Sequence, residues 1–397
     1  MARKVRTGLV GCGGIGKTHA LALASLPEST FAACCDLDGA RARALAEEHG
    51  VPRVYTDVHE LLQSGEVDAV CVCTPHPSHA PVVVAAAEAG VHALCEKPMA
   101  ADLAAADRMI AAARRAGIRF GVIFQRRFWP AARRIRAAID AGKLGTPTLG
   151  ECAVRLWRPE SYFARDAWRG TWATEGGGAL MNQAVHAIDH FQWFMGPAVE
   201  VFGRYATLLH GGYIDVEDTA VATVAFRSGA LGVIQAATTV NPNLGFRVTI
   251  HGATGATASL WEQPEGVEGV NDLWTVPGEE AFLSIWEESR KARPGFPEFH
   301  ALQIQDFLQA ILEDREPAVT GEEGRKSLEI ILAIYESSRT GLPVRLPATP
   351  EVYGSWRGPD GVSPGAPPTE VGARGSQARR EVPLRGLARP PTGQPPA

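Results

Sequence analysis

The sequence predicts an α/β protein: a doubly wound parallel sheet, followed by a second α/β domain with a large, mostly antiparallel open sheet. Over residues 1–125, short apolar runs alternate with longer helical patterns, which is typical of parallel strands covered by helices on both faces. Strand patterns dominate residues 146–257, and two of them alternate apolar and polar residues as half-solvated strands do. The chain has 397 residues, which is enough for two domains and further segments.

The elements of the first domain follow each other in strict order. Each predicted strand is short and apolar throughout, as expected for a strand buried on both faces. We expect strands at 6–11, 30–35, 69–73, 91–95 and 119–123, with helices at 15–26, 38–49, 79–89 and 100–116 between them.

The character of the chain changes after Pro130, which suits the first turn of a helix reaching to about residue 141. Alternation at 220–226 and 230–236, separated by Arg227-Ser228-Gly229, indicates a hairpin. One helix, at 179–194, interrupts the strands, and two more are expected at 299–313 and 322–338.

The chain divides into three parts on this reading. Residues 1–125 form the first domain, and residues 126–347 form a second domain for substrate binding and oligomerisation. Residues 348–397 form a tail, in which 17 of the 47 residues from 351 onward are Gly or Pro. Such a segment buries too little apolar surface to offset its chain entropy, so we expect disorder there.

Composition excludes several classes of protein. The formal net charge is -5 and the ordered part has no long basic run, so nothing indicates a nucleic-acid partner. No stretch approaches the roughly 20 apolar residues of a membrane helix, and no signal peptide is evident. Seven cysteines, several in predicted buried strands, indicate reduced core residues and a cytoplasmic protein.

A glycine-rich turn joins the first predicted strand to the first predicted helix. In this setting the first glycine allows a tight turn, the second allows a pyrophosphate to approach, and the third lets helix and strand pack closely. The helix N-terminus then faces the negative charge. A bare tight turn is the alternative. We expect dinucleotide contacts from Gly11, Gly13, Gly14, Ile15 and Gly16, which stand in the run GCGGIG.

An acidic residue, Asp36, ends the second predicted strand 20 residues after Gly16. Its carboxylate would accept hydrogen bonds from the adenosine ribose and repel a phosphate at that position. Leu37 follows it, where a basic residue would suit a phosphate. The pattern therefore favours NAD over NADP, although a solvated acid at a strand end remains the simpler alternative.

Ligands of open parallel sheets sit outside the carboxyl ends of the strands, which directs attention to two strand ends. Thr74 and Pro75 follow one strand and should border the nicotinamide, with His79 a further candidate contact or a helix-capping residue. The next strand ends in Glu96-Lys97-Pro98. An ammonium there could stabilise alkoxide character as hydride leaves carbon. On its own, Lys97 would be read as a surface lysine.

These motifs together resemble the family of glucose-fructose oxidoreductase, inositol dehydrogenase and rhizopine-catabolism proteins (Gfo/Idh/MocA). The resemblance extends through 155–196 and the closing helices, and covers essentially residues 3–347. It implies a Rossmann domain followed by an α/β domain whose open sheet often makes oligomer contacts. It also implies that Glu96, Lys97 and Gln125 lie near the nicotinamide, with Lys97 polarising the reacting oxygen.

The third candidate site is the segment GGGALMNQAVHAID at 176–189. On a helix Asn182, His186 and Asp189 share one face, which could align a substrate hydroxyl, a base and an orienting acid. The resemblance implies that His186 is the general base, a role that suits imidazole. Asn182 departs from the pattern of sugar-alcohol dehydrogenases, where an aspartate often stands, so a His–Asp proton relay is in doubt. The run Met181-Asn182-Gln183 resembles the corresponding run in a subset of the family that includes nucleotide-sugar dehydrogenases.

Arginine and aromatic residues near these motifs are candidates for substrate binding, either by stacking on a sugar ring or by pairing with a carboxylate or phosphate. Surface or interface packing is an equal alternative for each. The candidates are Arg127, Arg158, Trp168 and Arg169, with Asn182 and Asp189 beside them. No cysteine is close enough to complete a zinc site around His186, Asp189 and His190, so no metal is expected.

The reaction expected is reversible oxidation of a secondary alcohol of a sugar, inositol or sugar derivative, with NAD as cofactor. The partner is a small sugar or polyol, and the protein is expected to be a homodimer or homotetramer. Two alternatives remain: an NAD-dependent glycoside hydrolase or lyase that oxidises its substrate transiently, and a non-catalytic dinucleotide-binding regulator. Retention of both Lys97 and His186 argues against the regulator.

Overall fold

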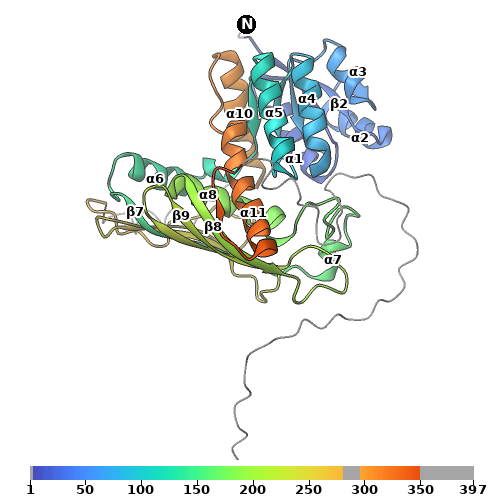
Figure 1. The fold of residues 1–397 in the computed structure, drawn as a ribbon. Helices are drawn as coiled ribbons and strands as arrows, with labels where there is room; N and C mark the ends of the chain where they lie inside the picture. Colours follow the sequence, from blue (N-terminus) through green and yellow to red (C-terminus); the bar gives the residue numbers. More distant parts are fainter. Residues whose placement is uncertain (1–2, 280–295, 349–397) are drawn as a thin grey trace, which may run out of the picture. The chain divides into compact units, whose positions relative to one another are not determined.

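The computed structural model describes residues 3–279 and 296–348. Apart from its first residue, Ala348, the predicted tail therefore lies outside the described residues. Two sheets organise the rest of the chain, and the α/β fold class expected from the sequence is confirmed (Figure 1). None of the described helices is long and apolar enough to span a membrane.

The first sheet has six strands in the order β3-β2-β1-β4-β5-β6, and all its pairings are parallel. Helices lie on both of its faces, as the continuously apolar strands require. Strand β3 and helix α3 were not expected, because three strand residues and one short helix give little periodicity. The elements are β1 (Val5–Val10), α1 (Gly14–Ser25), β2 (Ser29–Cys35), α2 (Gly39–His49), β3 (Arg53–Tyr55), α3 (Val58–Gln63), β4 (Ala69–Val72), α4 (His79–Glu88), β5 (His92–Cys95), α5 (Leu103–Ala116) and β6 (Phe120–Val122).

The second sheet has seven strands in the order β12-β11-β7-β10-β9-β8-β13. Among these described strands only the β7–β10 pairing is parallel, so the sheet is mostly antiparallel as expected. Its strands are β7 (Pro147–Arg155), β8 (Ala198–Ala206), β9 (Thr219–Phe226), β10 (Leu231–Ala237), β11 (Gly245–Gly252), β12 (Thr257–Glu262) and β13 (Val344–Arg345).

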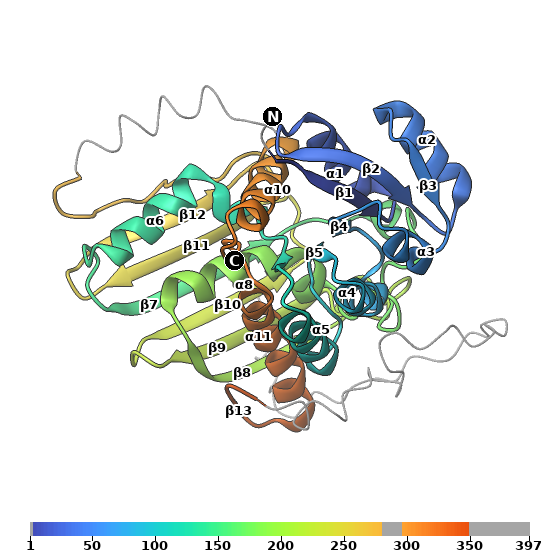
Figure 2. The same ribbon diagram turned by 90° about the horizontal axis from the view of Figure 1, so that it is seen from above.

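Helices cover one face of this second sheet (Figure 2). These are α6 (Pro130–Asp140), α8 (Val185–Met195) and α11 (Gly321–Thr340). Along β9 and β10 every second side chain is buried against them, and the residues between are exposed or partly exposed. The exposed positions include Val221 and Leu231, at 54% and 62% exposure.

Helix α10 (Phe296–Leu312) comes late in the chain but packs against the first sheet. Its residues Ile304, Phe307 and Leu308 share a buried cluster with Leu9 of β1 and Leu23 of α1. The chain thus returns to its N-terminal part before α11 goes back to the second sheet (Figure 1). This crossing joins the two sheets into one packed body.

The helix expected at 179–194 begins differently from the prediction. Residues Ala179–Ala184 form a π-helical turn, labelled η3, and only Val185–Met195 are α-helical. A π turn places one extra residue in the turn and so rotates the side chains around the helix axis. Asn182 is therefore displaced from the face that His186 and Asp189 share within α8.

Candidate active site

The glycine turn after β1 has the geometry of a phosphate cradle. Gly11 has φ +96°, and a Cβ there would lie 2.6 Å from the Cys73 carbonyl carbon. A Cβ on Gly16 would lie 2.2 Å from the carbonyl oxygen of Gly11, so helix and turn touch there. By contrast, a Cβ on Gly13 or Gly14 would meet nothing within 4 Å. The first and last glycines therefore serve packing, and the middle two leave open space at the start of α1.

Ile15 lies in the first turn of α1 and packs its half-buried side chain against the neighbouring core.

Asp36, at the end of β2, lies beside the glycine turn. One carboxylate oxygen accepts the Cys12 N–H at 2.8 Å, and the other accepts the Asp38 N–H at 2.9 Å. Arg41 approaches the same carboxylate at 3.8 Å. The acid is therefore fixed by the backbone beside the cradle.

The loop after β4 carries Thr74 and Pro75, and the hydroxyl of Thr74 is buried without a hydrogen-bond partner. His79 was expected as a cofactor contact, but the structure argues against this. Its two ring nitrogens face the carbonyl oxygens of Pro98 and Thr74, at 2.9 and 2.8 Å, and the ring is fully buried. With no nitrogen left over, His79 holds two loops together.

Glu96 was also expected as a cofactor contact, and the structure shows both of its carboxylate oxygens bonded within the protein. One carboxylate oxygen bonds His19 Nε2 at 2.9 Å, and the other accepts the backbone N–H of Lys97 at 3.0 Å. Burial opposes its charge, but the bond to His19 and nearby cations outweigh burial and lower the pKa of Glu96 to about 2. Glu96 therefore supports the loop of Lys97 from inside. The Lys97–Pro98 peptide bond is cis.

His19, Glu96 and His300 form the one group of three metal-type ligand residues among the described residues whose ligand atoms lie within 4.8 Å of one another. All three are buried, and His19 and Glu96 already bond each other directly. The sequence offered His186, Asp189 and His190 as a second set of metal-type ligands. There the carboxylate of Asp189 is paired with Arg127.

Lys97 extends from the end of β5 to the π turn of the second domain. Its Nζ lies 3.3 Å from both the side-chain and the backbone oxygen of Asn182. On the other side of the same amide, Asn182 Nδ2 donates to Glu175 Oε1 at 2.5 Å. The sequence predicted Lys97 and Asn182 separately, and the structure brings them into contact. Glu175 was missed, although it directly precedes the Gly176–Gly178 run.

Glu175 is 2% exposed, and its second oxygen accepts the N–H of Gly170 at 2.6 Å. Burial raises the pKa of Glu175 to about 7, against the opposing effect of these two donors. Burial likewise lowers the pKa of Lys97 to about 8; Glu96 opposes this, whereas Arg126 adds to it. The site thus places an acid and an amine with shifted pKa values on one short chain of hydrogen bonds.

His186 lies on the first turn of α8 and is 6% exposed. Its Nδ1 has no hydrogen-bond partner. Burial and the positive charges of Arg126 and Lys97 hold its pKa well below the ordinary range, so the imidazole is neutral at pH 7. Gln125, in the short helix η2 (Gln125–Phe128), likewise buries an unpartnered Oε1. Unsatisfied buried polar atoms are costly and are commonly completed by a ligand or water.

Asp189 and Arg127 were expected to contact substrate, but the structure pairs them with each other. Arg127 Nε and Nη2 each lie 2.6 Å from the carboxylate oxygens of Asp189, and both side chains are buried. Glu323 of α11 adds a third contact at 3.1 Å. The π turn ends at Ala184, so it leaves the spacing of His186 and Asp189 within α8 unchanged; Asp189 is held instead by the pair with Arg127.

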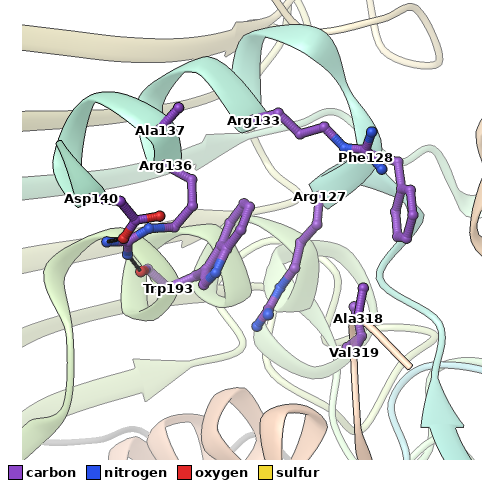
Figure 3. Close-up of a pocket in the computed structure, with 9 residues that line it drawn as sticks. All are labelled: Arg127, Phe128, Arg133, Arg136, Ala137, Asp140, Trp193, Ala318 and Val319. Atoms are coloured by element: carbon purple, nitrogen blue, oxygen red, sulfur yellow. Dashed lines mark hydrogen bonds and ion pairs between the residues drawn. The ribbon is translucent and has the colours of Figure 1, made fainter. Parts of the chain in front are cut away.

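A hollow of about 260 Å³ lies on the outer side of this ion pair, between α6, α8 and residues 318–319. Figure 3 shows Arg136 turned to Asp140 and to the Trp193 carbonyl oxygen. Neither Lys97 nor His186 lines it. The hollow is therefore separate from the chemistry-bearing residues.

Three predicted substrate residues form one aromatic and arginine network centred on Tyr162. The Tyr162 hydroxyl accepts from Arg169 Nη1 and from Gln183 Nε2, both at 2.7 Å. Arg169 lies over the Trp168 ring, 4.3 Å from its centroid, and Arg158 donates to Gln183. Because Gln183 is next to Asn182, the network reaches the residue that contacts Lys97.

A second acid missed by sequence reasoning, Glu217, fixes the start of the π turn. Its carboxylate accepts the N–H groups of Gly178 and Leu180 at 2.8 Å and the Tyr335 hydroxyl at 2.9 Å. A Cβ on Gly178 would lie 2.1 Å from the Glu217 carbonyl oxygen, so glycine is required there. The glycine run was noticed in the sequence, but its buried acidic partner lies 39 residues beyond Gly178.

Comparison with known proteins agrees with these features. The oxidoreductase family with an NAD-binding Rossmann fold matches residues 5–124, and its C-terminal α/β domain matches residues 136–346. The chain belongs to the Gfo/Idh/MocA family. The resemblance inferred from sequence motifs is therefore confirmed. The protein is an oxidoreductase, and NAD is its cofactor.

Several members of the family are similar over nearly their whole length. The WlbA dehydrogenase of Bordetella pertussis, solved with NADH and UDP-GlcNAcA, is 31% identical with a TM-score of 0.78, over 87% of this chain and 100% of that one. Myo-inositol 2-dehydrogenase of Thermotoga maritima is 29% identical, over 86% of this chain and 98% of its own. D-apiose dehydrogenase of Paraburkholderia graminis is 28% identical, over 87% and 90%.

The residues present suit the cofactor. Open space beside Gly13 and Gly14 admits a pyrophosphate close to the backbone, and Asp36 stands where a ribose would be recognised. The unpartnered oxygens of Thr74, in the loop after β4, and of Gln125, in η2 after β6, lie at the carboxyl edge of the same sheet. The first sheet therefore presents binding groups for both ends of a dinucleotide.

Proposed function

We propose that this enzyme transfers a hydride between NAD and a secondary alcohol carbon of a sugar, an inositol or a sugar derivative such as a nucleotide sugar. One observation carries the proposal: the Lys97 ammonium, at the carboxyl end of a strand in the cofactor domain, contacts Asn182 of the second domain. A donor at that strand end is suited to hold the oxygen of an alcohol whose carbon faces a nicotinamide.

Each residue has a distinct task in this proposal. The Lys97 ammonium donates a hydrogen bond to the reacting oxygen and stabilises it as alkoxide character develops. His186, kept neutral by its surroundings, accepts the hydroxyl proton. Asn182 holds Lys97 in place, since its two oxygens both lie within reach of Nζ. Bound NAD supplies the hydride acceptor.

The aromatic and arginine network around Tyr162 is proposed to recognise the substrate. The face of Trp168 can stack on a sugar ring, and the guanidinium groups of Arg158 and Arg169 suit hydroxyl, carboxylate or phosphate groups. Arg158 and Arg169 already have acidic neighbours, Glu265 and Asp166. Relatives that act on inositol or apiose, and one crystallised with a nucleotide sugar, support this range of substrates.

We further propose that the protein assembles through the open face of the seven-stranded sheet as a homodimer or homotetramer in the cytoplasm. The exposed apolar side chains on this face are Leu149, Phe202, Val221, Leu231 and Val233. All seven cysteines are unpaired, which suits a reducing compartment. Light scattering on the wild type and on Leu231→Lys tests the assembly: the variant should dissociate, and an unchanged mass would place the interface elsewhere.

A substrate screen tests the proposed reaction. Purified protein with NAD is offered inositols, free sugars, glycosides, sugar acids and nucleotide sugars, and NADH formation is followed with product analysis. Stoichiometric NADH and a ketone product are expected for one class. Cleavage of a glycoside without net NADH would instead establish the hydrolase or lyase alternative. Failure of every class with NAD bound would contradict the proposal.

A further inference from the structure

The hydrogen-bond chain behind Lys97 has a fixed direction. A carboxylate only accepts hydrogen bonds and an ammonium only donates them, whereas an amide does both. The Asn182 side chain lies between Glu175 and Lys97, so only one orientation of its amide satisfies both neighbours. Its NH₂ group must face the acid and its oxygen must face the amine.

We propose that Glu175 is the positioning residue that keeps Lys97 protonated and in place, acting through the amide of Asn182. This chain has asparagine at 182, where a carboxylate would act on the amine directly. The acid is instead one step farther away, at the residue before the glycine run. The proposal rests on the proposed function in giving Lys97 a role at the reacting oxygen.

The surroundings of Glu175 fit this task. Both of its oxygens face donors, Asn182 Nδ2 and the Gly170 N–H, so a protonated carboxyl would have no acceptor for its own hydrogen there. The ionised form is the one that these contacts complete. Its main-chain oxygen accepts from His76 Nδ1 at 2.8 Å, which ties the segment to the loop after β4. Glu175 is therefore held by both halves of the molecule, its carboxylate by the second domain and its main chain by the first.

Lys97 needs such a partner because its other neighbours are mostly unfavourable to a positive charge. Burial, Arg126 and Arg169 all lower the pKa of Lys97, whereas Glu96 and Glu175 raise it. Of these two acids, Glu96 is already bonded to His19. The titratable groups whose charges act on Lys97 are Glu96, Arg126, Arg169, Glu175, His76, His79 and His186; those acting on Glu175 are Arg169, Lys97 and Tyr335.

An exchange of the acid and the amide separates charge from geometry. In Glu175→Gln, one amide must face both Gly170 N–H and Asn182 Nδ2, so a hydrogen bond and the negative charge are lost together. In the double variant Glu175→Gln/Asn182→Asp, the new amide at position 175 accepts from Gly170 N–H and donates to the new carboxylate at position 182, which accepts directly from Lys97. Every hydrogen bond is then restored, and the charge lies next to the amine.

The titration of Lys97 itself is the readout, and it needs neither substrate nor turnover. The chain has few lysines, so ¹³C-lysine-labelled protein gives few signals, and Lys97→Met identifies the one of interest. The midpoint of the Lys97 titration should fall by about one pH unit in Glu175→Gln and rise above the wild-type value in the double variant. The alkaline limb of the pH–rate profile should move in the same directions.

Midpoints unchanged within about 0.3 unit in both variants would overturn the proposal, because a structural role alone does not move the pKa of Lys97. If Glu175→Gln does not fold, the double variant against wild type still decides the matter, since its midpoint must rise. Absence of dehydrogenase activity with a shifted Lys97 titration would contradict the proposed function and leave this inference standing.

Discussion

Arg127 and Asp189, 62 residues apart in sequence, form a two-pronged ion pair inside the protein, with both N–O distances at 2.6 Å. The pair joins η2, directly after the cofactor domain, to the helix that carries His186. Arg127 also reaches Glu323 of α11. One guanidinium thereby fixes three elements around the site.

Removing one member of this pair should destabilise the protein strongly. Arg127→Met leaves the Asp189 carboxylate buried without its cation, so we expect a loss of about 3–5 kcal/mol in the free energy of unfolding, measured by urea denaturation. The matched double variant Arg127→Met/Asp189→Leu removes both charges and should lose clearly less. Equal losses in the two variants would show that the pair is not the cause.

The glycines of the cradle should divide into two classes. Gly16→Ala brings a Cβ to 2.2 Å from the Gly11 carbonyl oxygen, so we expect a lower melting temperature or failure to fold. Gly13→Ala places its Cβ in open space and should leave the melting temperature nearly unchanged, but weaken NADH binding. Calorimetry and NADH titration check both. Tight NADH binding by Gly13→Ala would place the pyrophosphate elsewhere.

Asp36 should decide between NAD and NADP. Its fixed carboxylate repels a ribose phosphate, and Arg41 lies 3.8 Å away. In Asp36→Ala the repulsion is gone and Arg41 loses one of its two acidic neighbours, so NAD should bind more weakly and NADP relatively better, by roughly tenfold or more, about 1.4 kcal/mol. Glu47→Ala, which removes an exposed acid farther along α2, is the control. Unchanged preference would remove Asp36 from ribose recognition.

These contacts show which parts of the site a sequence can predict. The glycine run, Asp36 and Lys97 occupy ends of strands and turns whose spacing is local, and each is placed by the element next to it. Glu175 and Glu217 bond residues at the π turn at 179–184, and the Arg127–Asp189 pair depends on a contact between distant segments. An ideal helix predicted that residues 182, 186 and 189 share one face, and the π turn displaces Asn182 from the other two.

The value of kcat/KM for the alcohol should decrease at both ends of the pH range, at pH values shifted from those of an ordinary lysine and an ordinary histidine. Lys97 must be protonated to donate, and its pKa is lowered to about 8, so activity should fall as pH rises through about 8. His186 must be neutral to accept, and its pKa lies well below the ordinary value, so its acid limb should lie well below pH 6.5. A limb near pH 6.5 without alkaline loss would contradict both assignments.

The central claim is that the Lys97 ammonium serves the reacting oxygen and does not serve cofactor binding. Its most direct test compares Lys97→Met with Lys143→Met, which removes a partly exposed lysine paired with Glu279. For each variant, kcat with the best alcohol and the dissociation constant for NADH are measured. We predict that Lys97→Met lowers kcat by about 10²–10³-fold or more, with NADH affinity within a few-fold of wild type. An unchanged kcat, or a loss explained entirely by weaker NADH binding, would contradict the claim.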